Sequence, residues 1–442
     1  MTTDLMPNRY IPGEVDVPVR EKELISRRDK VLGASYRLQY RRPVHFVRGD
    51  GMWLYDPDGQ RYLDFYNNVP SLGHCNREVS EAMAEQAGKL SANTRYLEPN
   101  LVAYAERLVS TFPGELDRVI FTCTGSESND LALRIARLVS GGEGIIVSSY
   151  AYHGTSAAVA AVSPNLGDAV DLSPNVRMVS LPGPEGIPDD RAAEFFEAQV
   201  RAAVVDLRRR GIGVAALLMD TIFSSDGVWV DPPGFIAGGV EAARSAGALF
   251  IADEVQPGFG RTGSHMWGFE RHGVVPDLVT LGKPMGNGFP IGAVVGCSAP
   301  IEMFGATARY SNTFAGNTVG IAAANAVLTI MARERIRENV SAMAKRLRLG
   351  LEELAAQQQG ILGLRNAGLF FGVDMGVNGG GSSSRRKLAL DVVNAMRDDG
   401  VLISTTGANE DTLKIRPPLV CQEEHVDLFL AALKKALELV VK

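Results

Sequence analysis

The chain has 442 residues, with 45% hydrophobic and 22% charged side chains. This composition is ordinary for a soluble globular protein, and the length allows a large core in two or more domains. The formal net charge is −6 at pH 7 and no long basic run occurs, which argues against nucleic acid as a partner. The N-terminus lacks the apolar core of a signal peptide, and no apolar run reaches the roughly 18 residues of a membrane span. No membrane association is therefore expected.

The four cysteines lie far apart along the chain and form no CxxC pair. Neither a zinc site nor a disulfide framework is therefore expected, and a cytoplasmic location in a reducing environment is favoured. These residues are Cys75, Cys123, Cys297 and Cys421.

The first 74 residues predict an arm followed by a small strand meander. Residues 1–20 are polar and proline-bearing, which indicates an irregular arm, and residues 21–31 predict a helix. Residues 44–47 and 52–55 predict two short strands, because they flank the turn sequence Arg48-Gly49-Asp50-Gly51.

From about residue 75 to 330, strand and helix patterns alternate. The expected core strands share continuous apolar runs and lie around residues 119–121, 145–147, 177–179, 215–219, 249–251 and 278–280. Continuous apolar strands between helices predict an α/β domain with a mainly parallel sheet that is covered on both faces.

The C-terminal third predicts a smaller α+β domain. Residues 321–359 indicate one long or broken helix, and strands are expected at 369–374, 401–404 and 412–415. The low-complexity run at 378–386 predicts a flexible surface loop. The expected division is residues 1–74 as arm and meander belonging to the small domain, 75–325 as the large domain, and 326–442 as the C-terminal small domain.

Two strand ends carry the residues of greatest chemical interest. An apolar run ends abruptly at Asp253, and the next predicted strand is followed by Gly282 and Lys283. An acid and a lysine in these places suit a pyridoxal phosphate site, with Asp253 keeping the pyridine nitrogen protonated and Lys283 holding the cofactor aldehyde. The alternative is a buried salt bridge between two strand ends, and these two residues do not decide between them.

Three further motifs favour a cofactor site. The small-residue turn at Gly125-Ser126 opens a predicted helix, and a helix N-terminus suits a phosphate group, although an ordinary helix cap has the same pattern. Tyr152-His153 follows a predicted strand, where an aromatic ring can stack on a flat cofactor. The run from Tyr310 to Asn317 offers hydroxyl groups and a tight glycine before an alanine-rich helix.

Taken in order, these motifs resemble those of the class III aminotransferases, which are fold type I enzymes that use pyridoxal 5'-phosphate. The resemblance runs from about Arg28 to the C-terminus. It rests on five motifs: Gly125-Ser126-Glu127-Ser128-Asn129, Tyr152-His153-Gly154, Asp253-Glu254-Val255-Gln256, Gly282-Lys283 and Asn312-Thr313-Phe314-Ala315-Gly316-Asn317.

The resemblance implies a role for each site residue. Gly125 and Ser126 would bind the cofactor phosphate, Tyr152 would cover one face of the ring, and Gln256 would lie near the ring hydroxyl. His153 would either orient Tyr152 or simply pack. Thr313 would reach the cofactor phosphate of a second subunit, which implies a homodimer with shared active sites.

A narrower resemblance points to the branch that contains ethanolamine-phosphate phospho-lyases and alanine–glyoxylate-type aminotransferases. It rests on five segments: Tyr66-Asn67-Asn68-Val69-Pro70, Gly73-His74-Cys75, Asn93-Thr94-Arg95-Tyr96-Leu97, Lys283-Pro284-Met285-Gly286-Asn287-Gly288 and Leu413-Lys414-Ile415-Arg416-Pro417-Pro418.

Three departures from the family pattern favour a phosphorylated amine as substrate. Lys414 stands where family aminotransferases commonly have an arginine for the substrate carboxylate, and uncharged Ser225 aligns with a glutamate that covers that arginine in some members. Arg77 replaces a frequent proline. Lysine acts as a point charge that suits phosphate as well as carboxylate. Lys414, Arg416 and Arg77 are therefore candidate ligands of a substrate phosphate, the alternative for each being a solvated surface side chain.

The sequence thus predicts a phospho-lyase that eliminates phosphate and ammonia from O-phosphoethanolamine or a related amine. The alternative enzyme is an aminotransferase that uses pyruvate or glyoxylate. A non-catalytic homologue with a binding role is a third reading, which the presence of both Asp253 and Lys283 disfavours.

Overall fold

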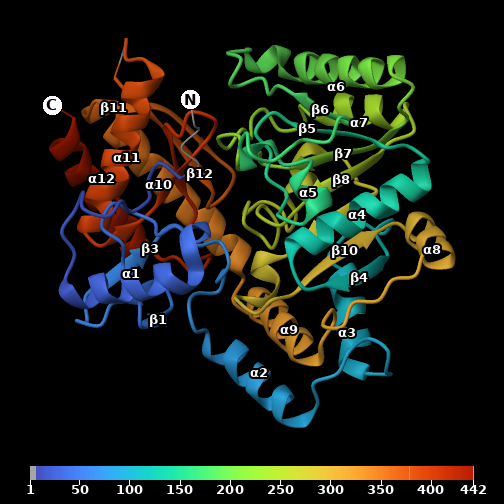
Figure 1. Cartoon of the computed structure of the whole chain (residues 1–442), viewed down its shortest axis with the longest axis horizontal. Helices are drawn as coiled ribbons and strands as arrows, with labels where there is room; N and C mark the ends of the chain where they lie inside the picture. Colours follow the sequence, from blue (N-terminus) through green and yellow to red (C-terminus); the bar gives the residue numbers. More distant parts are fainter. Residues whose placement is uncertain (1–5, 378, 442) are drawn as a thin grey trace.

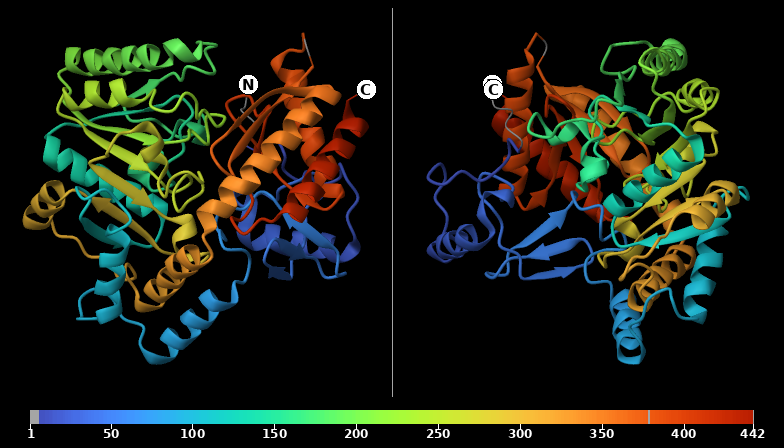
Figure 2. Two further views of the ribbon diagram at one scale, coloured as in Figure 1. Left: turned by 180° about the vertical axis from the view of Figure 1, so that it is seen from behind. Right: turned by 45° about the vertical axis from the view of Figure 1, so that its right-hand side comes forward.

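A computed structural model describes residues 6–377 and 379–441, so residues 1–5 of the predicted arm and Asn378 lie outside the described part. The chain forms two lobes (Figure 1). The larger lobe holds a central sheet between layers of helices, and the smaller lobe combines both ends of the chain. Turning the molecule shows α10 running from the base of the larger lobe into the smaller one (Figure 2).

The larger lobe is built on a seven-stranded sheet in the order β4-β10-β9-β8-β7-β5-β6. The five neighbouring strands β9, β8, β7, β5 and β6 are parallel. Strand β10 runs antiparallel to both of its neighbours, β9 and β4. The predicted mainly parallel sheet is confirmed, and the antiparallel β10 is an addition to the prediction. The strands are β4 (Arg118–Thr122), β5 (Gly144–Ser148), β6 (Val176–Val179), β7 (Val214–Asp220), β8 (Leu249–Asp253), β9 (Leu278–Leu281) and β10 (Gly292–Gly296).

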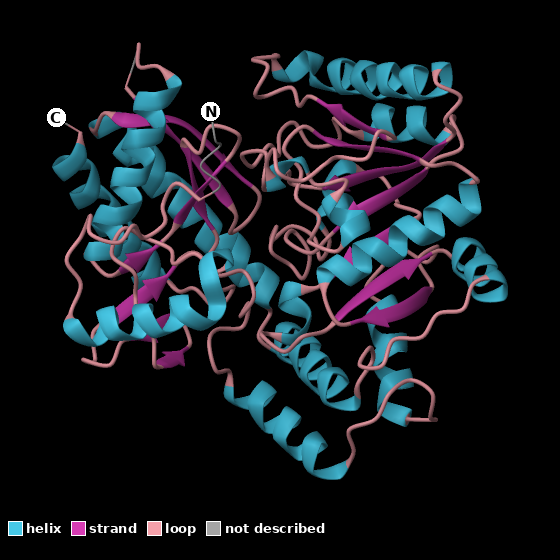
Figure 3. Cartoon of the chain, in the orientation of Figure 1, coloured by secondary structure: helices cyan, strands magenta, loops and turns pink. Residues whose placement is uncertain are grey.

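Alternate side chains of these strands enter two separate cores. Ile145 and Val147 pack with Leu131 and Ile135 of α4 on one face, whereas Ile146 belongs to the core on the other face. Because side chains alternate along a strand, an apolar run of this kind must be covered on both sides. The helices of this lobe, drawn in cyan in Figure 3, are α2 (Arg77–Lys89), α3 (Pro99–Val109), α4 (Gly125–Ser140), α5 (Ala157–Ala160), α6 (Ala192–Arg209), α7 (Ala237–Arg244), α8 (Ser298–Thr307) and α9 (Thr318–Arg333).

The smaller lobe contains two four-stranded sheets, in the orders β11-β12-β15-β14 and β1-β2-β3-β13. Strand β13 pairs in parallel with β3, so the N-terminal meander and the C-terminal segment share one sheet. The strands are β1 (Arg48–Asp50), β2 (Trp53–Tyr55), β3 (Arg61–Asp64), β11 (Gly360–Asn366), β12 (Phe371–Gly376), β13 (Val401–Leu402), β14 (Ser404–Thr406) and β15 (Thr412–Ile415), and the helices are α1 (Val19–Leu32), α10 (Ile336–Gln357), α11 (Ser382–Asp398) and α12 (Glu423–Val440).

Three local predictions need correction. The first meander strand is Arg48–Asp50 rather than 44–47, because the turn falls at Gly51, whose φ of 55° suits glycine. The expected loop at 378–386 already contains the start of α11 at Ser382. This helix forms despite its serine-rich start because its later residues, among them Val392 and Met396, are fully buried. Strand β11 was not predicted.

The long helix predicted at 321–359 is broken into α9 and α10. Arg335 lies between them with a φ of 49°, a left-handed conformation that ends the first helix. The predicted domain boundary at 325 falls within α9. Among the described residues, no helix is long and apolar enough to cross a membrane.

Candidate active site

The carboxyl ends of three neighbouring strands, β7, β8 and β9, meet at one polar cavity of about 110 Å³. Strand β8 ends at Asp253, β7 ends at Asp220, and Lys283 follows β9 at the start of a short 3₁₀ turn, Lys283–Gly286. The crevice beyond the carboxyl ends of strands is where open α/β sheets bind ligands. Its lining residues are Thr124, Gly125, Ser126, Tyr152, His153, Gly154, Asp220, Asp253, Val255, Gln256 and Lys283.

Asp253 is buried and held by three donors. The Asp253 Oδ2 atom lies 2.7 Å from His153 Nδ1 and accepts from Asn129 Nδ2 at 2.9 Å, while Oδ1 accepts from Val255 N at 3.1 Å. Since the ionised carboxylate only accepts hydrogen bonds, His153 carries its proton on Nδ1. These contacts fix the position of the Asp253 carboxylate, as a partner for a pyridine nitrogen requires.

His153 thus orients Asp253. No hydrogen bond joins His153 to Tyr152 among the described residues, so the first of the two predicted roles of His153 is not observed. The Nε2 atom of His153 is buried without a hydrogen-bond partner. Asn129 also contacts the histidine, by donating to its backbone carbonyl at 2.8 Å.

Lys283 is half-buried at the end of the cavity and has an unusual backbone, with a φ of 32°. Burial, together with the nearby positive charge of Arg416, lowers the pKa of Lys283 to about 8. More of this amine is therefore neutral near physiological pH than of an exposed lysine, and only the neutral amine is nucleophilic.

An anion-binding cradle opens on the same cavity. Helix α4 begins at Gly125, and the side chain of Thr124 caps it by accepting from Glu127 N at 3.1 Å. A Cβ atom at Gly125 would approach Val255 within 2.9 Å, so glycine is required here for close packing. The N-terminus of this 16-residue helix, with the Ser126 hydroxyl beside it, suits a phosphate group.

The cavity fits pyridoxal 5'-phosphate on three independent points. It brings together an amine of lowered pKa, a buried carboxylate held in place by hydrogen-bond donors, and a helix N-terminus for an anion. Tyr152 lines the cavity at the end of β5, where a flat ring would stack. Seven of the predicted cofactor residues therefore converge: Gly125, Ser126, Tyr152, His153, Asp253, Gln256 and Lys283.

Arg416 adjoins the cavity through Gln256. Its Nη1 donates to Gln256 Oε1 at 2.5 Å and its Nε donates to the Tyr66 carbonyl at 2.6 Å, while the guanidinium lies 4.8 Å from the Tyr66 ring centroid. No described carboxylate forms an ion pair with Arg416. A guanidinium that lies next to a cofactor cavity and has no carboxylate partner is suited to bind an anion.

Lys414 is buried on β15, with its ammonium 5.6 Å from the Phe370 ring centroid. Burial and the nearby Arg416 lower the pKa of Lys414 well below its ordinary value. A bound anion would act in the opposite direction and favour the charged form.

Two predicted residues lie away from the cavity in this chain. Arg77 is the first residue of α2, where its exposed side chain pairs with Glu81 at 2.6 Å one turn later. It does not line the cavity. Thr313 is exposed on the loop before α9, beside Phe314, which is 72% exposed.

The sequence reasoning did not assign roles to Asn129 or Asp220. Asn129 ends the Gly125–Asn129 motif, one helical turn after the start of α4, and its side chain reaches Asp253. Asp220 ends an apolar strand in the same way as Asp253, and the two are paired across β7 and β8. The pattern that singled out Asp253 was therefore also present at Asp220.

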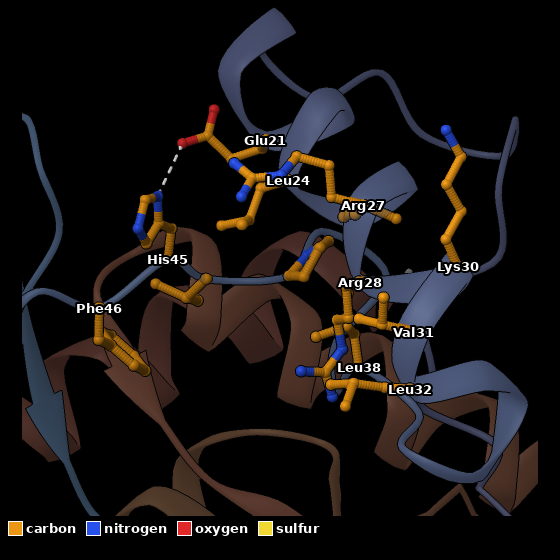
Figure 4. A pocket seen from close by; sticks show the side chains of 13 residues that line it. Glu21, Leu24, Arg27, Arg28, Lys30, Val31, Leu32, Leu38, His45 and Phe46 are labelled. Carbon is orange, nitrogen blue, oxygen red and sulfur yellow. Dashed lines mark hydrogen bonds and ion pairs between the residues drawn. The ribbon is translucent and has the colours of Figure 1, made fainter.

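A larger cavity, of about 620 Å³, lies between α1 and residues 38–46. Figure 4 shows its mostly apolar lining, with Leu24, Val31 and Leu32 on the helix side. Its one drawn polar contact joins His45 Nδ1 to Glu21 Oε1 at 3.3 Å. It has no counterpart of the lysine, acid and anion cradle at the strand ends.

The profile of the family described as aminotransferase class-III matches residues 36–437. The chain belongs to the class III aminotransferase family. It is 36% identical over 433 residues to an alanine–glyoxylate aminotransferase 2-like protein of Drosophila melanogaster, which covers 95% of this chain and 88% of that protein. It is 33% identical over 442 residues to ethanolamine-phosphate phospho-lyase homolog 1 of Caenorhabditis elegans. This match covers 95% of this chain and 94% of that protein.

Among solved structures, a phospholyase from Arthrobacter in complex with phosphoethanolamine is similar over nearly the whole chain. The TM-score is 0.90 and the sequence identity 42%, with 94% of this chain and 99% of that chain covered. The predicted family and its fold type I architecture are thus confirmed.

Proposed function

We propose that this protein is a pyridoxal phosphate-dependent phospho-lyase that converts O-phosphoethanolamine, or a related phosphorylated amine, and one water into an aldehyde, ammonia and phosphate. The observation that carries the proposal is the Arg416 guanidinium beside the cofactor cavity, which forms no ion pair with any described carboxylate and has buried Lys414 close by. Similarity to the Arthrobacter phospholyase and to the Caenorhabditis elegans homologue supports it.

The residues of the cavity divide the chemistry between them. When bound, pyridoxal phosphate accepts the electron pair that remains after the carbon next to nitrogen loses its proton. The Lys283 amine, released by the substrate amine, is placed to take that proton, and Asp253 keeps the pyridine nitrogen charged. Arg416 and Lys414 hold the substrate phosphate, which departs from the adjacent carbon with its bonding electrons.

An aminotransferase is the second candidate, supported by the similarity to the Drosophila protein. Such an enzyme must bind the carboxylates of an amino acid and a keto acid in turn. Ser225, at the position of a covering glutamate in some members, is uncharged and offers only its carbonyl, to Gly407 N and to the Thr406 hydroxyl. Ser225 therefore supplies no acidic cover for the carboxylate-binding position, which Lys414 occupies here, and this favours the phospho-lyase.

Phosphoethanolamine alone is expected to release phosphate, with no keto acid added. Lys414→Ala should lower kcat/KM for this reaction by about ten- to a hundredfold, because a charge-assisted contact to phosphate is worth roughly 1.5–3 kcal/mol. Cofactor binding should change little. Phosphate release and aldehyde formation are measured by steady-state kinetics.

Arg77→Ala is the matched control, since Arg77 pairs with Glu81 at the surface and is expected to leave kcat/KM within about twofold. Turnover of alanine with pyruvate or glyoxylate, without any release of phosphate from phosphoethanolamine, would replace the phospho-lyase with the aminotransferase.

We further propose that the active unit is a homodimer with shared sites, in which Thr313 serves the cofactor phosphate of the partner. Exposed apolar residues lie next to Thr313 in the chain and on the segment whose Arg95 donates to Ser311: Phe314 is 72% exposed, Leu97 103% and Tyr96 69%. Exposed apolar groups of this size mark protein contact surfaces.

Subunit mixing tests the shared site. A Lys283→Ala protein mixed with a Thr313→Ala protein is expected to recover activity, because each mixed dimer contains one site free of both substitutions. Activity is measured after subunit exchange has been verified with differently tagged chains. If exchange is complete and activity does not rise above that of either parent, the sites are not shared in this way.

A further inference from the structure

A chain of side-chain hydrogen bonds runs from Arg416 to Asp220 without interruption. Arg416 Nη1 donates to Gln256 Oε1 at 2.5 Å, Gln256 Nε2 donates to the Ser224 hydroxyl, and Ser224 Oγ donates to Asp220 Oδ2 at 2.5 Å. All three donors point the same way, from a cation to a carboxylate. Bonds aligned in this manner polarise and strengthen one another in a buried setting.

The guanidinium decides the orientation of the Gln256 amide. Arginine has only donors, so the Gln256 oxygen faces Arg416 and its nitrogen faces Ser224. Ser224 then has one arrangement that satisfies both neighbours: its oxygen accepts from Gln256 and its proton goes to Asp220. Ser224 is fully buried and Gln256 is 7% exposed, so solvent does not compete for these bonds.

The backbone holds Ser224 in its place. Asp220 Oδ1 accepts from Ile222 N at 3.0 Å, and its Oδ2 accepts from Ser224 N at 3.1 Å, which closes a tight turn after β7. Buried Phe223 within this turn has a φ of 50°, a costly conformation for a bulky residue. The turn thus presents the Ser224 hydroxyl to Asp220 and Gln256 together.

At the Arg416 end of this hydrogen-bond chain, one side of the guanidinium stays available for a ligand. Its Nε and Nη1 are bound to Tyr66 and Gln256, and no described residue bonds its Nη2. A neutral amide anchors the guanidinium without cancelling its charge, whereas a carboxylate partner would form an ion pair that a bound anion would first have to displace.

We propose that Ser224 is the positioning residue that keeps Arg416 fixed as a permanent anion receptor, through Gln256 on one side and Asp220 on the other. This inference rests on the proposed function, since it identifies how the same site holds its phosphorylated substrate. Ser224 acts through Gln256 and contacts neither the substrate nor the reacting atoms.

The test compares two adjacent serines. Ser224→Ala removes the central link, whereas Ser225→Ala removes a side chain for which no hydrogen bond is observed among the described residues. Ser224→Ala is expected to raise KM for phosphoethanolamine and Kd for inorganic phosphate roughly tenfold, with kcat within about twofold. Kd is measured by calorimetry on the cofactor-loaded enzyme. Ser225→Ala should match the parent, and Ser224→Thr, which keeps the hydroxyl, should restore most of the loss.

The inference is overturned if Ser224→Ala and Ser225→Ala have equal KM for phosphoethanolamine and equal Kd for phosphate. It is also overturned if Ser224→Ala lowers only kcat, or if the parent enzyme does not bind phosphate. If Ser224→Ala does not fold, Asp220→Asn is the second variant: it replaces one of the two accepting oxygens of Asp220 with a donor, weakens the acidic end of the hydrogen-bond chain, and is assessed by the same KM and Kd. Should the enzyme leave phosphoethanolamine intact and transaminate alanine, the proposed function fails, while the phosphate Kd still decides the role of Ser224.

Discussion

Lys283→Ala is expected to reduce turnover by about 10⁴-fold or more, the largest effect of any single substitution in this chain. The variant loses both the amine that attaches the cofactor and the base that takes the substrate proton. The fold should persist, because the cradle at Gly125 and Ser126 and the sheet beneath it do not depend on the lysine side chain. Turnover and circular dichroism are measured on the same preparation.

Chemical labelling tests directly whether Lys283 is the lysine that attaches the cofactor. Borohydride reduction of the yellow, cofactor-loaded parent should remove its absorption band and leave the cofactor on Lys283, as peptide mapping would show. Lys387→Ala is the control, because Lys387 is exposed on α11 and pairs with Asp391. A colourless protein after reconstitution, or a label on another lysine, contradicts the assignment.

The pH dependence of cofactor attachment gives a second readout for Lys283. Its pKa of about 8 lies below that of an ordinary lysine, so the neutral amine appears at lower pH. Starting from cofactor-free protein, the attachment rate should rise about tenfold per pH unit and level off above about pH 8. A rate that is still rising steeply beyond pH 10 would show that burial does not lower this pKa.

Asp253→Asn is expected to lower kcat by about 10²- to 10³-fold while the cofactor stays attached. The amide keeps the shape of the side chain and an oxygen for Asn129 and His153, but it has no charge to keep a pyridine nitrogen protonated. Losing one preorganised electrostatic partner typically costs this factor. The measurement is kcat together with the absorption spectrum across pH.

Asp253→Glu is the matched variant, since it retains the charge one methylene further along. It should keep more activity than Asp253→Asn, although its longer side chain disturbs a buried site. An Asp253→Asn enzyme within tenfold of the parent would show that this charge is not needed.

Much of the cofactor site could be predicted from the sequence because its residues stand at the ends of recognisable elements. The apolar runs before Asp253 and Lys283 are continuous, so their strand character is strong and their ends are sharp. The turn before α4 contains its own cap at Thr124. These signals are local, and the parallel sheet places their ends at one edge.

The elements that were missed have weaker local signals. Strands β10 and β11 both begin with glycine, while α11 starts within a serine-rich stretch. Tertiary packing stabilises all three: β10 pairs on both sides, β11 pairs with β12, and α11 buries Val392 and Met396. Propensity alone does not reveal such partners.

The sequence by itself determined the family, the cofactor cradle and the acid and lysine at the strand ends, because each depends on a few neighbouring residues. Only the tertiary structure decided which side chains meet across long separations. It paired His153 with Asp253, turned Arg77 to solvent beside Glu81, and joined Arg416 to Gln256, 160 residues away. Hydrogen bonds depend on distances of tenths of an ångström, and those distances are set by the packing of whole elements.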